Sequence, residues 1–193
     1  MAIFAGTTLD EARAIVARYP EGRERSAVMP LLYLAQSVEG HVTRDGLREV
    51  AALLGVTTAE VEAVASFYTM IRLRPTGRHV VSVCTNLACA LRGAKGVYEA
   101  AHRAAEIPHG EELSEDELIT LHEEECLGAC ERAPVVAVDF MYHDEVSPEG
   151  MVDIVASLRR GAVPRPSRGE AMPDFRAASR VLAGLELEPK VGT

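Results

Sequence analysis

The sequence is poor in several residue types that point to particular classes of protein. It has no tryptophan, only 5% aromatic residues and only four cysteines among 193 residues. Basic residues number 20 against 29 acidic residues, which gives a formal net charge of −9. This charge disfavours non-specific binding to nucleic acid or to an anionic membrane surface. No apolar run approaches the roughly 20 residues that a spanning helix needs, so direct membrane insertion is not expected.

The start of the sequence also lacks the features of a secretory signal. Its first twenty residues contain no basic n-region and no long apolar h-region. We therefore expect the protein to reside in a reducing cytosol. In that compartment, paired cysteines act as metal ligands or catalytic thiols more often than as disulfides. The remaining composition, 48% hydrophobic and 25% charged, is typical of a globular chain with room for two small domains.

The first part of the chain, residues 1–74, is predicted to be a bundle of short amphipathic helices. Apolar residues recur at helical spacing, and capping residues precede several of these runs. Thr43 opens "RDGLREVAALLG", Thr57 and Glu60 have capping-box spacing, and Ser26 precedes "AVMPLLYLAQSVEG", which stops at Gly40. The stretch "SFYTMIRL" (66–73) suits either a domain core or a docking surface, and the sequence leaves both open.

The second part, residues 75–162, changes to a mixture of strands and helices. Alternating apolar residues and turn residues predict strands at 79–84 and 117–122 and a hairpin of 134–139 with 140–144. Helical spacing and caps predict a helix at 91–106 and a second one that starts at Ser147–Pro148 and ends at Gly161. This order predicts a mixed sheet with helices packed on it, and so an α+β chain. Residues 163–193, with Pro164, Pro166 and Pro173 near their start, are predicted to be a partly disordered tail that can form one short helix.

The four cysteines are the strongest chemical signal. Cys84 ends the first predicted strand, Cys89 lies in the loop before the 91–106 helix, and Cys126 and Cys130 lie in the loop between the second and third strands. Both loops can lie at one end of the sheet and bring four thiolates together. The C-x4-C and C-x3-C intervals are wider than the usual zinc knuckle and favour an iron–sulfur cluster. Zinc and ordinary buried or disulfide-forming cysteines remain alternatives.

Three stretches resemble a known family: "YPEGRERSAVMPLLYLAQ" (19–36), "EVEAVASFYTMIRLRPTGRHVVSVCTNLAC" (60–89) and "EECLGACERAPVVAV" (124–138). The sequence is similar to the thioredoxin-like [2Fe–2S] subunit of respiratory NADH:quinone oxidoreductase, known as the E-type subunit in bacteria and as the 24 kDa subunit in mitochondria. The resemblance covers about residues 10–162. It implies a helical N-terminal domain, a thioredoxin-like ferredoxin domain and one [2Fe–2S] cluster. Cys84 and Cys89 would ligate one iron, and Cys126 and Cys130 the other.

The resemblance also implies how such a chain works. It would be an electron-transfer subunit without an active site of its own, and a partner flavoprotein subunit would bind NADH and FMN. Its place would be the cytoplasmic face of the plasma membrane, reached through the complex. Related subunits serve NAD-dependent hydrogenases and formate dehydrogenases, and the sequence separates these poorly. Nine acidic residues and no Lys or Arg occupy residues 106–125, so we expect a low-potential cluster, with Glu123–Glu125 as the main contributors.

Rival functions find less support in the sequence. The sequence shows neither a G-x-G-x-x-G loop nor a P-loop. None of the six histidines forms an i, i+4 pair, and each is expected at the surface or partly buried. "LREVAALLGVTTAEVEAVASF" (47–67) has the form of a helix-turn-helix, but its second helix carries Glu60 and Glu62 and no basic residue, which disfavours DNA binding. A thiol–disulfide oxidoreductase would need a C-x-x-C pair, and a free-standing ferredoxin would not need the helical part.

Overall fold

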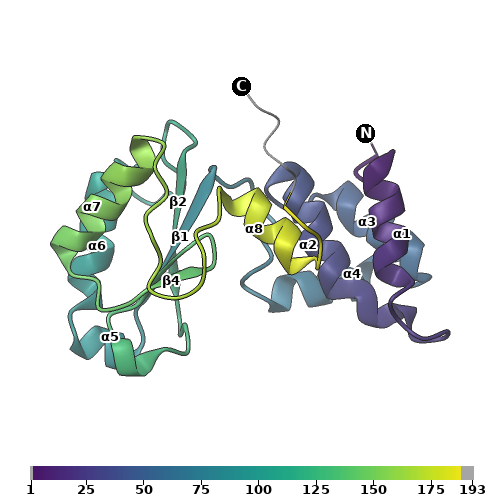
Figure 1. Cartoon of the computed structure of the whole chain (residues 1–193), viewed down its shortest axis with the longest axis horizontal. Coiled ribbons are helices and arrows are strands. Elements are labelled where there is room, and N and C mark those ends of the chain that lie inside the picture. The colour runs from purple at the N-terminus through teal and green to yellow at the C-terminus, as the bar shows by residue number, and fades with distance from the viewer. Residues whose placement is uncertain (1, 188–193) are drawn as a thin grey trace. The chain divides into compact units, whose positions relative to one another are not determined.

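The computed structural model describes residues 2–187 and divides the chain into two compact units (Figure 1). One unit holds the chain up to Pro75 together with the chain from Arg176 onward, and the other holds Thr76–Phe175. The described helices of the first unit are α1 (Thr7–Val16), the 3-10 helix η1 (Glu24–Ala27), α2 (Val28–Glu39), α3 (Arg44–Leu54), α4 (Thr58–Phe67) and α8 (Phe175–Leu182), whose first residue falls in the second unit.

Several helix boundaries of the first unit follow the predicted capping rules. The Thr43 side chain accepts a hydrogen bond from the Gly46 N–H at 3.1 Å, and Thr57 with Glu60 forms a complete capping box. Gly40 ends α2 with φ 79°, in the left-handed region that favours glycine. The predicted start of α2 at Ser26 was wrong, because a turn of 3-10 helix occupies Glu24–Ala27 and the α-helix begins only at Val28.

The stretch 66–73 is partly buried and partly exposed. Ile71 lies in the core at 5% exposure, whereas Phe67 is 77% exposed. Gln36, which is fully buried, holds the segment in place: its side chain accepts from the Arg72 N–H at 2.7 Å and donates to the Met70 carbonyl oxygen at 3.2 Å. Neither of the two alternatives for this stretch therefore describes it completely.

The predicted tail is ordered over most of its described length. α8 joins the first unit, where Gln36 donates to the Ser179 hydroxyl at 3.1 Å and Arg180 forms an ion pair with Glu11. Arg18 donates to the Gly184 carbonyl oxygen at 3.0 Å. The expected partial disorder at 188–193 lies outside the described residues. The boundaries 1–74, 75–162 and 163–193 stay a prediction.

The second unit is built on a mixed sheet with the strand order β2-β1-β3-β4 in the described residues. Its strands are β1 (His79–Cys84), β2 (Ile119–Glu124), β3 (Val136–Val138) and β4 (Met141–His143). β1 pairs in parallel with β2, so that His79 faces Ile119 and Cys84 faces Glu124. β1 and β3, and β3 and β4, are antiparallel. The predicted mixed sheet is confirmed, although β2 begins two residues later than expected.

Helices cover one face of this sheet. After β1 come α5 (Leu87–Leu91) and α6 (Ala94–Ala104), and α7 (Pro148–Arg159) follows β4; α6 and α7 lie side by side against the strands (Figure 1). The core between them is aliphatic and combines Val81, Val83, Ile119 and Leu121 of the sheet with Val97, Ala101, Met151, Val155 and Leu158 of the helices. The α+β class is confirmed. Among residues 2–187, no single helix could cross a membrane by length and apolarity, and α3 and α4 meet that test only as a pair bent by 118°.

Candidate metal centre

Cys84 and Cys89 come from the end of β1 and from the short helix α5. Cys84 is 3% exposed, and its thiol donates to the Glu125 carbonyl oxygen at 3.9 Å. Cys89 is 2% exposed and lies inside α5. The predicted loop position of Cys89 was wrong. The Asn86 side chain caps a helix that begins at Leu87, and Gly93, with φ 90°, separates that helix from α6.

Cys126 and Cys130 lie in the segment between β2 and β3, as expected, and both are exposed. Gly128 lies between them with φ 71°, in the left-handed region. Its N–H donates to the Cys126 sulfur at 3.4 Å. Cys130 begins the 3-10 helix η2 (Cys130–Arg132). The segment therefore already directs a backbone N–H toward sulfur, which is typical of sites that hold anionic sulfur ligands.

The thiols of the two pairs influence one another, and all four are free. Burial, with smaller contributions from the neighbouring Cys84 thiol and from Cys130, raises the pKa of Cys89 to about 11. A hydrogen bond with Cys126 raises the pKa of Cys130, to which Cys84 also contributes. The two cysteine segments meet at the end of β1, where Ala129, the neighbour of Cys130, packs in one buried cluster with Cys84 and Cys89.

This donor set fits a bound metal centre. Cysteine binds metal as the thiolate, and here burial and mutual repulsion oppose thiolate formation unless a positive centre compensates the charge. In the described part of the chain, no three His, Cys, Asp or Glu side chains are already arranged as a metal site. The fit rests on ligand chemistry: four thiols in two pairs from separate segments suit a [2Fe–2S] cluster, and by ligand type also zinc.

The surroundings of the thiols are small and apolar. Ala94, Ala129, Ala133 and Val135 form one buried cluster with Cys84 and Cys89, and Ala88 packs against it. The sequence suggested that Ala88, Ala129 and Ala133 let the chain approach a cluster closely, and the structure brings all three to the thiols. A dry, apolar wall on one side and exposed Cys126 and Cys130 on the other give the site a buried half and a solvent-facing half.

The acidic stretch is less uniform than its composition suggested. Glu106 and Asp116 contact the Arg159 guanidinium at 3.4 and 3.7 Å. Glu124 lies opposite Cys84 in the sheet, and its side chain is 14% exposed. Its carboxylate lies 3.9 Å from His122 Nε2. Glu124 is thus one of the predicted acids whose backbone lies directly beside a site cysteine.

A buried hydrogen-bonded pair, His79 with Asp139, was missed by the sequence analysis. His79 Nδ1 lies 2.6 Å from Asp139 Oδ2, and both side chains are almost completely buried. The other carboxylate oxygen of Asp139 accepts from the Val80 N–H at 2.8 Å. Burial raises the pKa of Asp139 above its usual range, against the lowering effect of His79. The expectation that His79 is surface-exposed or only partly buried was wrong, and the pair lies at the start of β1, away from the cysteines at its end.

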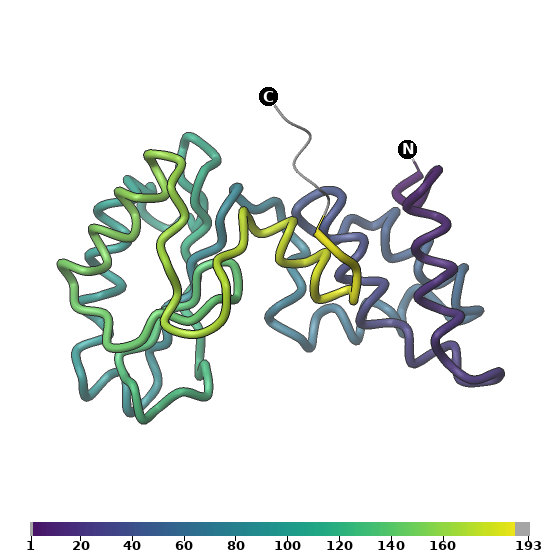
Figure 2. The backbone as a smooth tube through the Cα atoms, viewed as in Figure 1, coloured from purple at the N-terminus to yellow at the C-terminus, as the bar shows by residue number. Residues whose placement is uncertain are grey.

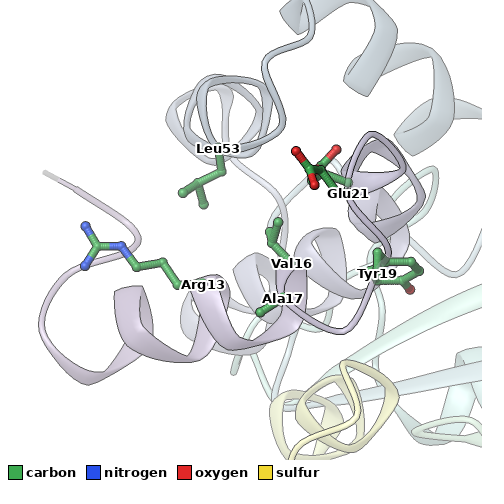
Figure 3. A pocket seen from close by; sticks show the side chains of 7 residues that line it. Arg13, Val16, Ala17, Tyr19, Glu21 and Leu53 are labelled. Carbon is green, nitrogen blue, oxygen red and sulfur yellow. The ribbon is translucent and has the colours of Figure 1, made fainter.

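The helical unit contains a hollow of about 380 Å³ beside α1 and α3 (Figure 3). Its wall is mixed in character and consists of Arg13, Val16, Ala17, Tyr19, Glu21, Glu24 and Leu53. Backbone hydrogen bonds from Glu24 and Gly22 lower the pKa of Glu24. These side chains are not a set of metal ligands or a nucleophile with a base, so the cysteine site is the stronger candidate.

Comparison with known proteins identifies relatives of this arrangement. The family model for thioredoxin-like [2Fe–2S] ferredoxins matches residues 12–159. The chain is 45% identical to the E-type subunit of NADH-quinone oxidoreductase from Mycobacterium tuberculosis, over 91% of its own length and 68% of that protein. It is 37% identical to the Rickettsia bellii protein of the same name, over 81% of its length and 93% of that protein.

A solved structure shares the fold. A chain of an NAD⁺-reducing [NiFe]-hydrogenase in the H2-reduced state superposes with a TM-score of 0.61 at 17% identity. The match covers 71% of the present chain but only 22% of the hydrogenase chain. At this identity the likeness concerns the fold alone.

Proposed function

Because the chain belongs to the thioredoxin-like [2Fe–2S] ferredoxin family, we propose that it is an electron-transfer subunit of an NADH:quinone oxidoreductase. The observation that carries this proposal is the meeting of the two cysteine segments at one end of the sheet, where the Cys84 thiol donates to the Glu125 carbonyl oxygen and Ala129 packs in one buried cluster with Cys84 and Cys89. The relatives named as NADH-quinone oxidoreductase subunits match the chain across most of its length, which supports the choice of complex.

Each cysteine pair has a role in this proposal. Cys84 and Cys89 hold the buried half of one [2Fe–2S] cluster, and Cys126 and Cys130 hold the exposed half. When bound, the cluster supplies one-electron redox chemistry. Residues of the chain set its surroundings: the alanines keep one side dry, and the Gly128 N–H is placed to donate to a ligand sulfur. The chain would carry no catalytic residues of its own.

The proposed electron partner is a flavoprotein subunit that binds NADH and FMN. Electron exchange needs close approach, and α5 offers a surface for it. Leu87 and Leu91 are 70% and 79% exposed on the helix that carries Cys89. Exposed apolar side chains beside a site favour a protein contact. The complex would lie at the cytoplasmic face of the membrane.

An equivalent subunit of an NAD-dependent hydrogenase or formate dehydrogenase would use the same site. The fold likeness to the hydrogenase chain is compatible with that alternative. The 45% identity to the M. tuberculosis NADH-quinone oxidoreductase subunit favours the quinone-reducing complex.

NADH should reduce the cluster of this chain only through the flavoprotein. The test mixes the cluster-loaded chain with the flavoprotein partner from the same organism, adds NADH without oxygen, and follows the visible absorbance and the EPR signal of the cluster. Reduction is expected with the flavoprotein and not without it. Reduction by NADH in the chain alone, or no reduction in the mixture, would contradict the proposed function.

Replacing Glu124 by glutamine should raise the midpoint potential of the cluster. A carboxylate about 10 Å from the centre, at an effective dielectric of about 20, contributes at most about 1.7 kcal/mol, or about 70 mV for one electron. Removing this charge makes the added electron less costly, so we expect a rise of tens of millivolts in a redox titration. Glu106→Gln is the matched control, because Glu106 follows α6 at the opposite end of the sheet and pairs with Arg159. Equal midpoints for wild type and Glu124→Gln would contradict this role.

A further inference from the structure

The chain between α7 and α8 lies along the outer strand of the sheet (Figure 2). β4 is an edge strand, and the Ser167 N–H donates to the Tyr142 carbonyl oxygen at 2.7 Å. The Asp144 N–H donates back to the Ser167 hydroxyl at 2.8 Å. Gly169, with φ 74°, runs close to Met141. The family match ends at residue 159, before this segment begins.

Arg168 in this segment contacts three groups of the sheet unit. Its guanidinium donates to the Asp144 carboxylate at 2.8 Å and lies 3.7 Å from the Glu131 carboxylate. Its Cζ atom lies 5.2 Å from the centre of the Tyr142 ring, which is cation–π distance. The Asp144 side chain is only 8% exposed, so this contact is better shielded from water than a typical surface pair.

Two of these groups lead directly to the cysteine segment. The Tyr142 hydroxyl donates to the Leu127 carbonyl oxygen at 2.7 Å, and Leu127 lies between Cys126 and Cys130. Glu131 directly follows Cys130 in the chain. Arg168 therefore contacts Glu131, which adjoins Cys130, and the ring of Tyr142, whose hydroxyl binds Leu127 in the middle of the segment.

We propose that Arg168 is a positioning residue that fixes the Cys126–Cys130 segment from outside the matched domain. Cys126 and Cys130 are the exposed half of the ligand set, and within their segment Ala129 alone is buried. A segment held in its ligand geometry before metal is present binds a cluster at lower entropic cost and releases it more slowly. This inference rests on the proposed function for its meaning, but the contact itself is testable without a cluster.

The first test measures amide hydrogen exchange of residues 126–132 in the full chain without cluster. Arg168→Ala should speed exchange on the order of fivefold, since it removes a charge-assisted bond and a ring contact. Arg168→Lys keeps the positive charge and should retain part of the protection. Tyr142→Phe removes only the hydroxyl that binds the Leu127 carbonyl, leaves the ring in place and should also speed exchange. Arg160→Ala is the control, because Arg160 is an exposed arginine whose side chain donates to Ser157 of its own helix.

The second test measures iron loss from the loaded chain to a chelator. Arg168→Ala and Tyr142→Phe should lose iron several-fold faster than wild type and Arg160→Ala. Unchanged amide exchange of residues 126–132 in Arg168→Ala and Tyr142→Phe would overturn the inference. Equal exchange in Arg168→Lys and Arg168→Ala would overturn it as well. Faster exchange without faster iron loss would also overturn it. If the wild-type chain binds no iron and sulfide at all, the proposed function fails, and the exchange comparison still decides whether Arg168 holds the segment.

Discussion

Replacing Cys89 by alanine is expected to leave the chain without a stable cluster. Cys89 is 2% exposed, so no water or substitute side chain can easily take the place of its sulfur. The variant should therefore retain close to none of the iron and acid-labile sulfide that the wild type holds per chain. Iron and sulfide analysis after anaerobic purification measures this directly.

The matched control is Ala88→Ser, which changes the neighbouring residue by a single hydroxyl and leaves all four thiols. It should keep the cluster. Cys126→Ala should also lose it, although Cys126 is exposed, because two ligands are needed on each iron. A Cys89→Ala chain with wild-type iron and sulfide would show that the thiol is not a ligand.

Replacing Asp139 by alanine is expected to destabilise the sheet unit by about 2–4 kcal/mol, because it leaves two buried polar groups without their hydrogen-bond partner, at about 1–3 kcal/mol each. The substitution removes the carboxylate that lies 2.6 Å from His79 Nδ1 and that accepts the hydrogen bond from the Val80 N–H. Asp139→Asn, which keeps an acceptor oxygen, should cost less. Urea unfolding followed by circular dichroism, with exchange of the β1 amides as a local probe, measures the difference.

Asp10→Ala is the control for this prediction. Asp10 lies 3.8 Å from Arg13, and its side chain is 78% exposed. Exposed pairs of this kind contribute at most about 1 kcal/mol. Equal stability of Asp139→Ala and Asp10→Ala would mean that the His79–Asp139 pair does not stabilise the sheet.

The places of the cysteine pairs along the sheet could be predicted in outline because their signals are local. The two cysteine pairs follow strand patterns directly, and Gly128 and the alanines stand within a few residues of the thiols. The caps at Thr43 and Thr57 are local as well, and the structure confirms both. The missed start of α5 had a local signal too: Asn86 is a preferred capping residue placed directly before Leu87.

The contacts that the sequence did not reveal join residues far apart in the chain. His79 and Asp139 are 60 positions apart, and neither is unusual in its own stretch of sequence. The segment after residue 162 has the composition of a loose tail, with Pro164, Pro166 and Pro173. Its order comes from single side chains such as Arg168 and Ser179, whose partners at Asp144 and Gln36 no local pattern reveals. The composition of a segment indicates what it can form alone, but it does not indicate which distant residues the segment packs against in the folded chain.

The central claim is that the four thiols hold one [2Fe–2S] cluster. The most direct measurement is iron, acid-labile sulfide and zinc per chain on anaerobically purified protein, with an EPR spectrum after dithionite reduction. The account predicts about two irons, two sulfides and the signal of one reduced [2Fe–2S] centre. One zinc with no sulfide would contradict it, and the four cysteines would then form a structural metal site.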